Sequence, residues 1–321
     1  MEQEKHSTPL PFNNLFLNSA AVHGYNYWWI YVLGITASFF GYLVFQIIIQ
    51  FPLVAIALKN NILLSDLEKN PGIIFDPDKM GIDRNIILAM LLGMFVFALG
   101  ALFMVVKRVH KKPVLSIITA YSKLRYKRFF TAFGIWAVLL VVSVIVAYKL
   151  DPTGVSVQFK PAQFFTLMLV CVLLMPIQTS TEEILIRGYL MQGLSLAFKN
   201  GIIPLIITSL LFGFLHMENP EAKTFGWQVM LPYYSLFGLF LGILTLLDEG
   251  LELALGIHCA NNVISSLLVT SPSGVLKTDA IFLVTKEDPV AELILWACMA
   301  SVTFVIFWLI YRWKNFNLIL K

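Results

Sequence analysis

The chain has 321 residues, of which 58% are hydrophobic and only 13% are charged, and its mean hydropathy is +0.79. This composition excludes a water-soluble globular domain and indicates an integral, multi-pass membrane protein, which would lie in the plasma membrane if the organism is prokaryotic. The net charge of +4 gives no sign of a nucleic-acid partner, so the expected surroundings are the lipid bilayer.

Residues 1–26 lack a basic start followed by an apolar stretch and a small-residue cleavage site, so we expect no removable signal peptide. Apolar runs of about 20 residues can each cross a bilayer. Eight such runs are predicted, at 27–57, 85–106, 129–148, 161–180, 201–216, 227–247, 251–270 and 290–311. The first is long and contains Pro52, so we expect it to tilt, kink or end in an interfacial turn. The fold class is therefore all-α, a bundle of about eight transmembrane helices.

The loop between the second and third runs contains basic residues and no acid, whereas the loop 58–84 contains both signs. Its basic residues are Lys107, Arg108, Lys111, Lys112, Lys123, Arg125, Lys127 and Arg128. Since basic loops are retained in the cytoplasm, we expect this loop and both termini to be cytoplasmic. The connectors 59–84, 149–160, 217–226 and 271–289 should lie outside. We interpret the basic run as an anchor to phospholipids, in preference to a docking site.

Three cysteines, Cys171, Cys259 and Cys298, lie inside apolar runs without CxxC spacing. This pattern predicts packed free thiols and neither a disulfide framework nor a zinc knuckle.

The stretch 179–190, TSTEEILIRGYL, places Glu182, Glu183 and Arg187 at the end of a predicted span. A charge near the bilayer centre costs about 2.5–3.5 kcal/mol, so such residues usually face a protein interior and carry function. Glu183 and Arg187 are four apart and can pair on one helix face. Glu182 is rotated by about 100° and can face a different cavity, where it could act as a general base. The alternative is that both carboxylates belong to a cytoplasmic helix-cap network.

Two later runs also contain polar residues. FGFLH ends at His216, and HCANN places His258 and Asn262 four apart on one helix face. His216 alone could be an interfacial residue, but His258 and Asn262 need partners that lipid does not offer. If these groups converge with Glu182, a carboxylate and a histidine could deprotonate a water, while the other histidine and the amide stabilise an oxyanion. Cys259 points about 100° away from His258, which argues against a thiol protease.

These motifs resemble those of the CPBP family of intramembrane peptidases, named for CAAX proteases and bacteriocin-processing enzymes and also called type II CAAX prenyl endopeptidases or the Abi family. The family pattern is EExxxR, FxxxH and HxxxN on successive membrane helices, and this chain has all three in order. The resemblance implies a helical bundle with a conical cavity open to the cytoplasm or the bilayer. It implies that Glu182 activates water with help from His216, that His258 and Asn262 form the oxyanion site, and that Glu183 and Arg187 support the geometry.

The resemblance divides the chain into a cytoplasmic or interfacial segment at 1–26, three helices with the basic loop at 27–160, a catalytic core at 161–270, and a last helix with a basic end at 271–321. The substrate would be a peptide or membrane protein, and prenylation of it is not assumed. We expect no cofactor, because a metal held by Glu182 would remove the base. The alternative is one divalent metal such as Zn²⁺ on Glu182, His216 and His258. Rival functions are a proton-coupled transporter and a non-catalytic scaffold of the same fold.

Overall fold

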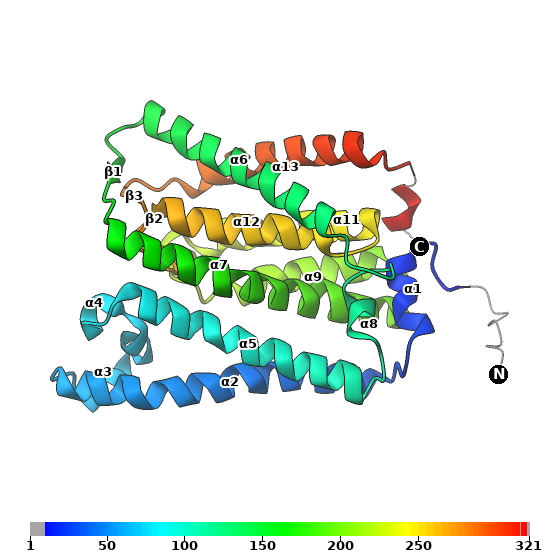
Figure 1. Ribbon diagram of the computed structural model, residues 1–321, viewed down its shortest axis with the longest axis horizontal. Helices are drawn as coiled ribbons and strands as arrows, with labels where there is room; N and C mark the ends of the chain where they lie inside the picture. Colours follow the sequence, from blue (N-terminus) through cyan, green and yellow to red (C-terminus); the bar gives the residue numbers. More distant parts are fainter. Residues whose placement is uncertain (1–9, 315, 320–321) are drawn as a thin grey trace.

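A computed structural model of the chain describes residues 10–314 and 316–319, so parts of the predicted first and last segments, residues 1–9, 315 and 320–321, lie outside the described residues. The protein is a helical bundle (Figure 1). Six helices within the described chain are long and apolar enough to cross a membrane, Trp28–Lys59, Arg84–Arg108, Tyr126–Lys149, Pro161–Phe198, Trp227–Asp248 and Pro289–Tyr311. The all-α, multi-pass membrane fold is therefore confirmed.

The elements follow one another along the chain with short connections. The α-helices are α1 (Leu15–Val22), α2 (Trp28–Lys59), α3 (Leu64–Lys69), α4 (Pro77–Met80), α5 (Arg84–Arg108), α6 (Tyr126–Leu150), α7 (Pro161–Glu183), α8 (Met191–Phe198), α9 (Ile202–Leu215), α10 (Pro220–Phe225), α11 (Trp227–Asp248), α12 (Glu252–Leu268) and α13 (Pro289–Tyr311). Tighter 3₁₀ turns are η1 (Pro71–Phe75), η2 (Val114–Ile117) and η4 (Phe316–Ile319), and η3 (Ile184–Leu190) is a π-helix. The strands are β1 (Val155–Val157), β2 (Val269–Thr270) and β3 (Phe282–Val284).

Each of the eight predicted apolar runs contains a helix, but two of these helices are short. α9 has 14 residues and α12 has 17. At 1.5 Å per residue they are about 21 and 26 Å long, less than the hydrocarbon core. The count of eight spans therefore stays a prediction. α2 has 32 residues and runs through Pro52 without the interfacial turn that we considered.

The order of packing places the motif-bearing helices at the centre. α2 lies against α5, α5 against α7, α7 against α12 and α12 against α6, while α11 packs on both α9 and α12 (Figure 1). α7 and α12 are thus covered on both sides by other helices. This arrangement explains how polar side chains on these two helices can avoid lipid.

Several of the connectors predicted to lie outside the membrane are found at one end of the bundle. Strand β3 lies between β1, to which it is antiparallel, and β2, to which it is parallel. These pairings join the connectors 149–160 and 271–289, and Lys277 Nζ lies 3.1 Å from Asp76 Oδ2 in the connector 59–84. Three of the four predicted outer connectors therefore meet at the same end (Figure 1).

The opposite end holds the basic loop and the two described ends of the chain. Leu15 N donates to Glu249 Oε1 at 2.7 Å, and Trp313 Nε1 donates to Asp248 Oδ1 at 3.3 Å. Ala120 in the basic loop also donates from its backbone N–H to the carbonyl of Glu249. Both described ends thus lie on one side of the bundle with this loop, as expected. Which side is cytoplasmic stays a prediction.

Part of the basic run is used inside the protein and not for anchoring. Arg125 Nη2 lies 2.6 Å from Glu252 Oε2 and 2.9 Å from Asp248 Oδ2, and Arg128 Nε lies 3.4 Å from Asp248 Oδ2. Lys112 is buried, its Nζ donates to Asn26 Oδ1, and burial lowers the pKa of its ammonium to about 8. The predicted anchor is therefore reduced to the exposed members of the run, Lys107, Arg108, Lys111, Lys123 and Lys127.

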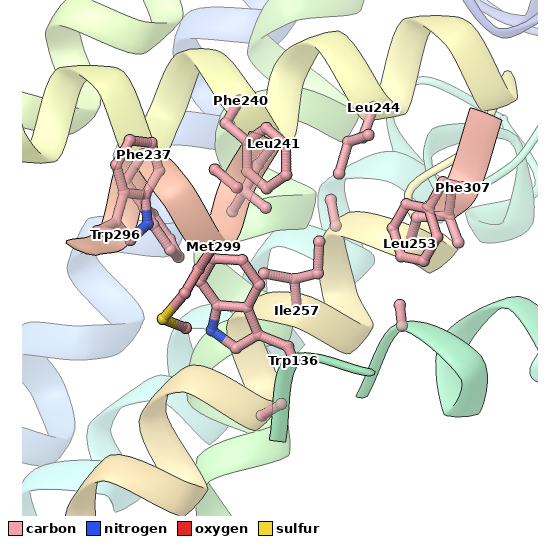
Figure 2. Packing of buried hydrophobic residues seen from close by; sticks show 14 of the residues in the cluster. Trp136, Phe237, Phe240, Leu241, Leu244, Leu253, Ile257, Trp296, Met299 and Phe307 are labelled. Carbon is pink, nitrogen blue, oxygen red and sulfur yellow. The ribbon is translucent and has the colours of Figure 1, made fainter. Parts of the chain in front are cut away.

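A large apolar core joins α6, α11, α12 and α13 (Figure 2). Trp136 on α6 is fully buried and packs against Phe240 on α11, with ring centroids 6.1 Å apart. The close approach of α12 to α6 requires Gly256, because a Cβ there would lie 2.4 Å from the carbonyl oxygen of Phe129. This core fixes α12 beside α6 and α11.

All three cysteines are free, as expected, and Cys171 and Cys259 are buried. The expectation that every thiol is packed is wrong for Cys298, which is exposed. The reason is that α13 lies at the margin of the bundle and only one of its faces contacts other helices (Figure 1).

Candidate active site

The site begins where α7 passes into a π-helix. α7 ends at Glu183, and the π-helical turn continues from Ile184 to Leu190. π-helical turns are rare, are wider than α-helical turns and often lie at functional sites. This π-helical turn carries Arg187, whereas Glu182 and Glu183 lie at the end of α7 just before it. The three charged side chains therefore lie within little more than one turn of each other.

The predicted pair of Glu183 and Arg187 is confirmed. Arg187 Nη1 donates to Glu183 Oε1 at 2.9 Å, and both side chains are fully buried. The guanidinium also lies 4.3 Å above the ring of Phe212, an arrangement that attracts a cation. Gly238 on α11 leaves room for it, since a Cβ at that position would be 2.9 Å from Arg187 Nη2.

His258 joins the two carboxylates. Its Nδ1 lies 2.8 Å from Glu183 Oε1 and its Nε2 lies 3.5 Å from Glu182 Oε2. A carboxylate can only accept, so Nδ1 carries a hydrogen and Nε2 is directed toward Glu182. The rings of Phe212 and Phe237 meet the imidazole edge-on, at centroid distances of 5.9 and 5.4 Å. Both carboxylates therefore lie beside one histidine.

Glu182 differs from Glu183 in the exposed fraction of its side chain. The side chain of Glu182 is 21% exposed, whereas that of Glu183 is 0% exposed. Gln178 Nε2 donates to Glu182 Oε1 at 2.5 Å. Within the described part of the chain, Glu182 Oε2 is itself buried and has no hydrogen-bond partner. One oxygen of this carboxylate is thus held while the other faces His258.

Asn262 is close to Glu182 but reaches it through an intermediate residue. Asn262 Nδ2 donates to Gln178 Oε1 at 2.9 Å, and Asn261 Nδ2 donates to Asn262 Oδ1 at 3.3 Å. Trp136 Nε1 in turn donates to Asn261 Oδ1 at 3.2 Å. The predicted face shared by His258 and Asn262 is therefore turned toward α7, because both side chains contact residues at its end.

His216 lies at the end of α9 and is held by aromatic rings. Its Nδ1 lies 2.7 Å from the carbonyl oxygen of Phe212, so Nδ1 donates and a neutral ring keeps a lone pair on Nε2. The imidazole stacks on Tyr234 at 4.4 Å and packs against Phe212 at 4.5 Å. Among the described residues it makes no hydrogen bond to Glu182. The ring is half-buried at this position, and whether it lies at the membrane interface stays open.

Sequence reasoning missed several residues of this site. Gln178 stands four residues before Glu182, and the spacing that paired Glu183 with Arg187 could have found it. Trp136, Asn261 and Tyr234 gave no comparable signal. An indole on α6, a second asparagine beside Asn262 and a tyrosine on an apolar helix have ordinary local patterns, and only packing between distant helices brings them here.

The metal alternative was a site on Glu182, His216 and His258. Across residues 10–314 and 316–319, no three histidine, cysteine, aspartate or glutamate side chains come together as ligands of one ion. The donors are instead engaged pairwise, His258 with the carboxylates and His216 with a carbonyl group.

Comparison with known proteins gives two matches. Residues 161–264 match a family described as type II CAAX prenyl endopeptidase Rce1-like. The chain is also 29% identical over 226 residues to the uncharacterized protein YyaK of Bacillus subtilis (strain 168), an alignment that covers 70% of this chain and 75% of that protein. No solved structure matches the present chain. The matched region contains every candidate residue from Glu182 to Asn262, so this part of the chain is similar to the Rce1-like domain of type II CAAX prenyl endopeptidases.

Proposed function

We propose that the protein is an intramembrane endopeptidase that hydrolyses a peptide bond of a membrane-associated substrate with a water activated by Glu182. The observation that carries the proposal is the contrast between two adjacent carboxylates around one histidine. Glu183 is fully buried and bound to Arg187 and His258, whereas Glu182 is 21% exposed and presents Oε2 toward His258 Nε2. Only the second carboxylate has a partly exposed side chain, and its buried Oε2 has no hydrogen-bond partner among the described residues, so it is the one proposed to bind the water.

In the proposed reaction, Glu182 accepts a proton from water as the water oxygen attacks the peptide carbonyl carbon. The neutral His216 contributes its Nε2 lone pair to hold that water. The C–N bond then breaks, and Glu182 returns the proton to the leaving nitrogen. Atoms and charge balance without a protein nucleophile.

The developing oxyanion needs donors. A doubly protonated His258 can donate from Nε2, and the Glu183 carboxylate bound to Nδ1 stabilises that charged ring. Asn262 donates one amide hydrogen to Gln178, and its second hydrogen is the other proposed donor. Losing one such donor typically costs about 10²–10³-fold in kcat.

The test uses the full-length protein, purified in detergent and reconstituted, with a panel of membrane-anchored peptides that includes prenylated and unmodified forms. We expect cleavage by the wild type and a loss of about 10²–10⁴-fold in kcat for Glu182→Gln, which removes the base but keeps the shape. Glu68→Gln is the matched control, because this acid is exposed on α3 at the outer end.

Full cleavage by Glu182→Gln would show that this carboxylate is not the base. Cleavage by the wild type of prenylated peptides only, or of both forms, defines the substrate class. Treatment of the same preparation with a chelator, followed by metal analysis, decides the metal alternative. A rate that falls with chelator and returns with Zn²⁺ would replace the metal-free mechanism.

A further inference from the structure

A line of hydrogen bonds runs from the core helix α6 to the carboxylate of Glu182. Trp136 Nε1 donates to Asn261 Oδ1 at 3.2 Å, and Asn261 Nδ2 donates to Asn262 Oδ1 at 3.3 Å. Asn262 Nδ2 donates to Gln178 Oε1 at 2.9 Å, and Gln178 Nε2 donates to Glu182 Oε1 at 2.5 Å. We call this the amide chain.

The two ends of the amide chain fix its direction. An indole N–H can only donate and a carboxylate can only accept. Each of the three amides between them therefore accepts through its oxygen and donates through its nitrogen. Rotating any one amide by 180° would place two acceptors or two donors face to face. Trp136, the first donor, is fully buried in the core around α6, so the amide chain starts from a tightly packed side chain.

We propose that Gln178 is a positioning residue, which holds Glu182 Oε1 so that Oε2 points toward His258 and the attacking water. The inference rests on the proposed role of Glu182 as the water-activating carboxylate. A hydrogen bond to a charged oxygen is roughly twice as strong as one between neutral groups. Gln178 is 8% exposed, so little water competes for this bond. Without Gln178, the carboxylate is free to rotate about its side-chain torsions.

The first test is Gln178→Leu, which has similar size but no donor. We expect kcat to fall by about 10–100-fold with KM changed by less than twofold, the usual cost of removing a group that orients a catalytic one. Thr245→Val is the matched control. Thr245 on α11 is fully buried and donates to the carbonyl of Leu241 in its own helix, so its loss should leave kcat unchanged.

The second test is Gln178→Glu, which replaces the amide donor with a carboxyl group beside Glu182. Two carboxyl groups in contact compete for one proton. We expect the acid limb of the rate–pH profile to move up by at least one pH unit, with folding retained because Asn262 can still donate. Trp136→Phe keeps an aromatic ring at the origin of the amide chain but removes the indole N–H together with part of the ring system, and it should lower kcat by a few fold at unchanged KM.

The outcomes separate this inference from the proposed function. A folded Gln178→Leu protein with wild-type kcat, or an unmoved acid limb in Gln178→Glu, overturns the positioning role while wild-type cleavage still supports the peptidase. If Gln178→Leu fails to fold, the position of the acid limb in the rate–pH profile of Gln178→Glu tests the positioning role by itself. A wild-type protein that cleaves no peptide contradicts the proposed function, and the positioning role falls with it.

Discussion

At the scale of single residues, the site depends on giving two neighbouring carboxylates different surroundings. Glu183 Oε1 accepts from both Arg187 and His258, and no part of its side chain reaches solvent. Such a group stabilises the fold only as a member of its pair, because a lone buried charge is strongly destabilising. Glu182 has an amide neighbour and partial exposure instead, which fits the role of base that we propose for it.

We predict that Arg187→Ala lowers both the yield of folded protein and its melting temperature. The substitution leaves Glu183 buried with His258 as its remaining partner, at a cost of about 3–5 kcal/mol. Lys223→Ala is the control, since it breaks the exposed pair of Lys223 and Glu218, whose side chains are 64% and 91% exposed. Such a pair contributes at most about 1 kcal/mol. Thermal unfolding of purified protein measures both. Equal melting temperatures for the two variants would mean that the buried pair does not stabilise the fold.

At the scale of elements, the position of α12 against α6 decides whether the site can form. α12 carries His258 and Asn262, and α6 carries Trp136, the origin of the amide chain. Contact between the two helices is possible because Gly256 presents no side chain to the backbone of Phe129. A small shift of α12 would therefore move both proposed oxyanion donors together.

We predict that Gly256→Ala destabilises the protein by about 1–3 kcal/mol, the usual cost of inserting a methyl group into a closely packed contact. The nearest obstacle is backbone, which cannot rotate away as a side chain could. Gly134→Ala on α6 is the matched control, because nothing lies within 4 Å of a Cβ there. It should be neutral or stabilise by up to about 1 kcal/mol through helix propensity. The prediction is contradicted if both variants melt at the same temperature as the wild type.

At the scale of the whole molecule, hydropathy predicted where the helices lie because each span must be apolar by itself. Motif spacing likewise predicted the pair of Glu183 and Arg187, since both residues stand on one turn of one segment. What could not be predicted depends on contacts between distant segments. The amide chain joins α6, α12 and α7, and the acids that neutralise Arg125 come from residues 248 and 252. Local patterns carry no information about such pairings.

The remaining whole-molecule prediction is orientation. The basic end of the bundle exposes Lys107, Arg108, Lys111, Lys123 and Lys127, and moving these charges across a bilayer is unfavourable, so we expect this end in the cytoplasm. In a Cys298→Ala background, which removes the exposed native thiol, Lys123→Cys reports on the basic end and Glu68→Cys on the outer end. A membrane-impermeant maleimide applied to intact cells should label the cysteine at 68, and should label the one at 123 only after permeabilisation. The reverse labelling pattern would mean that the basic end faces the outside of the cell, which contradicts the predicted orientation.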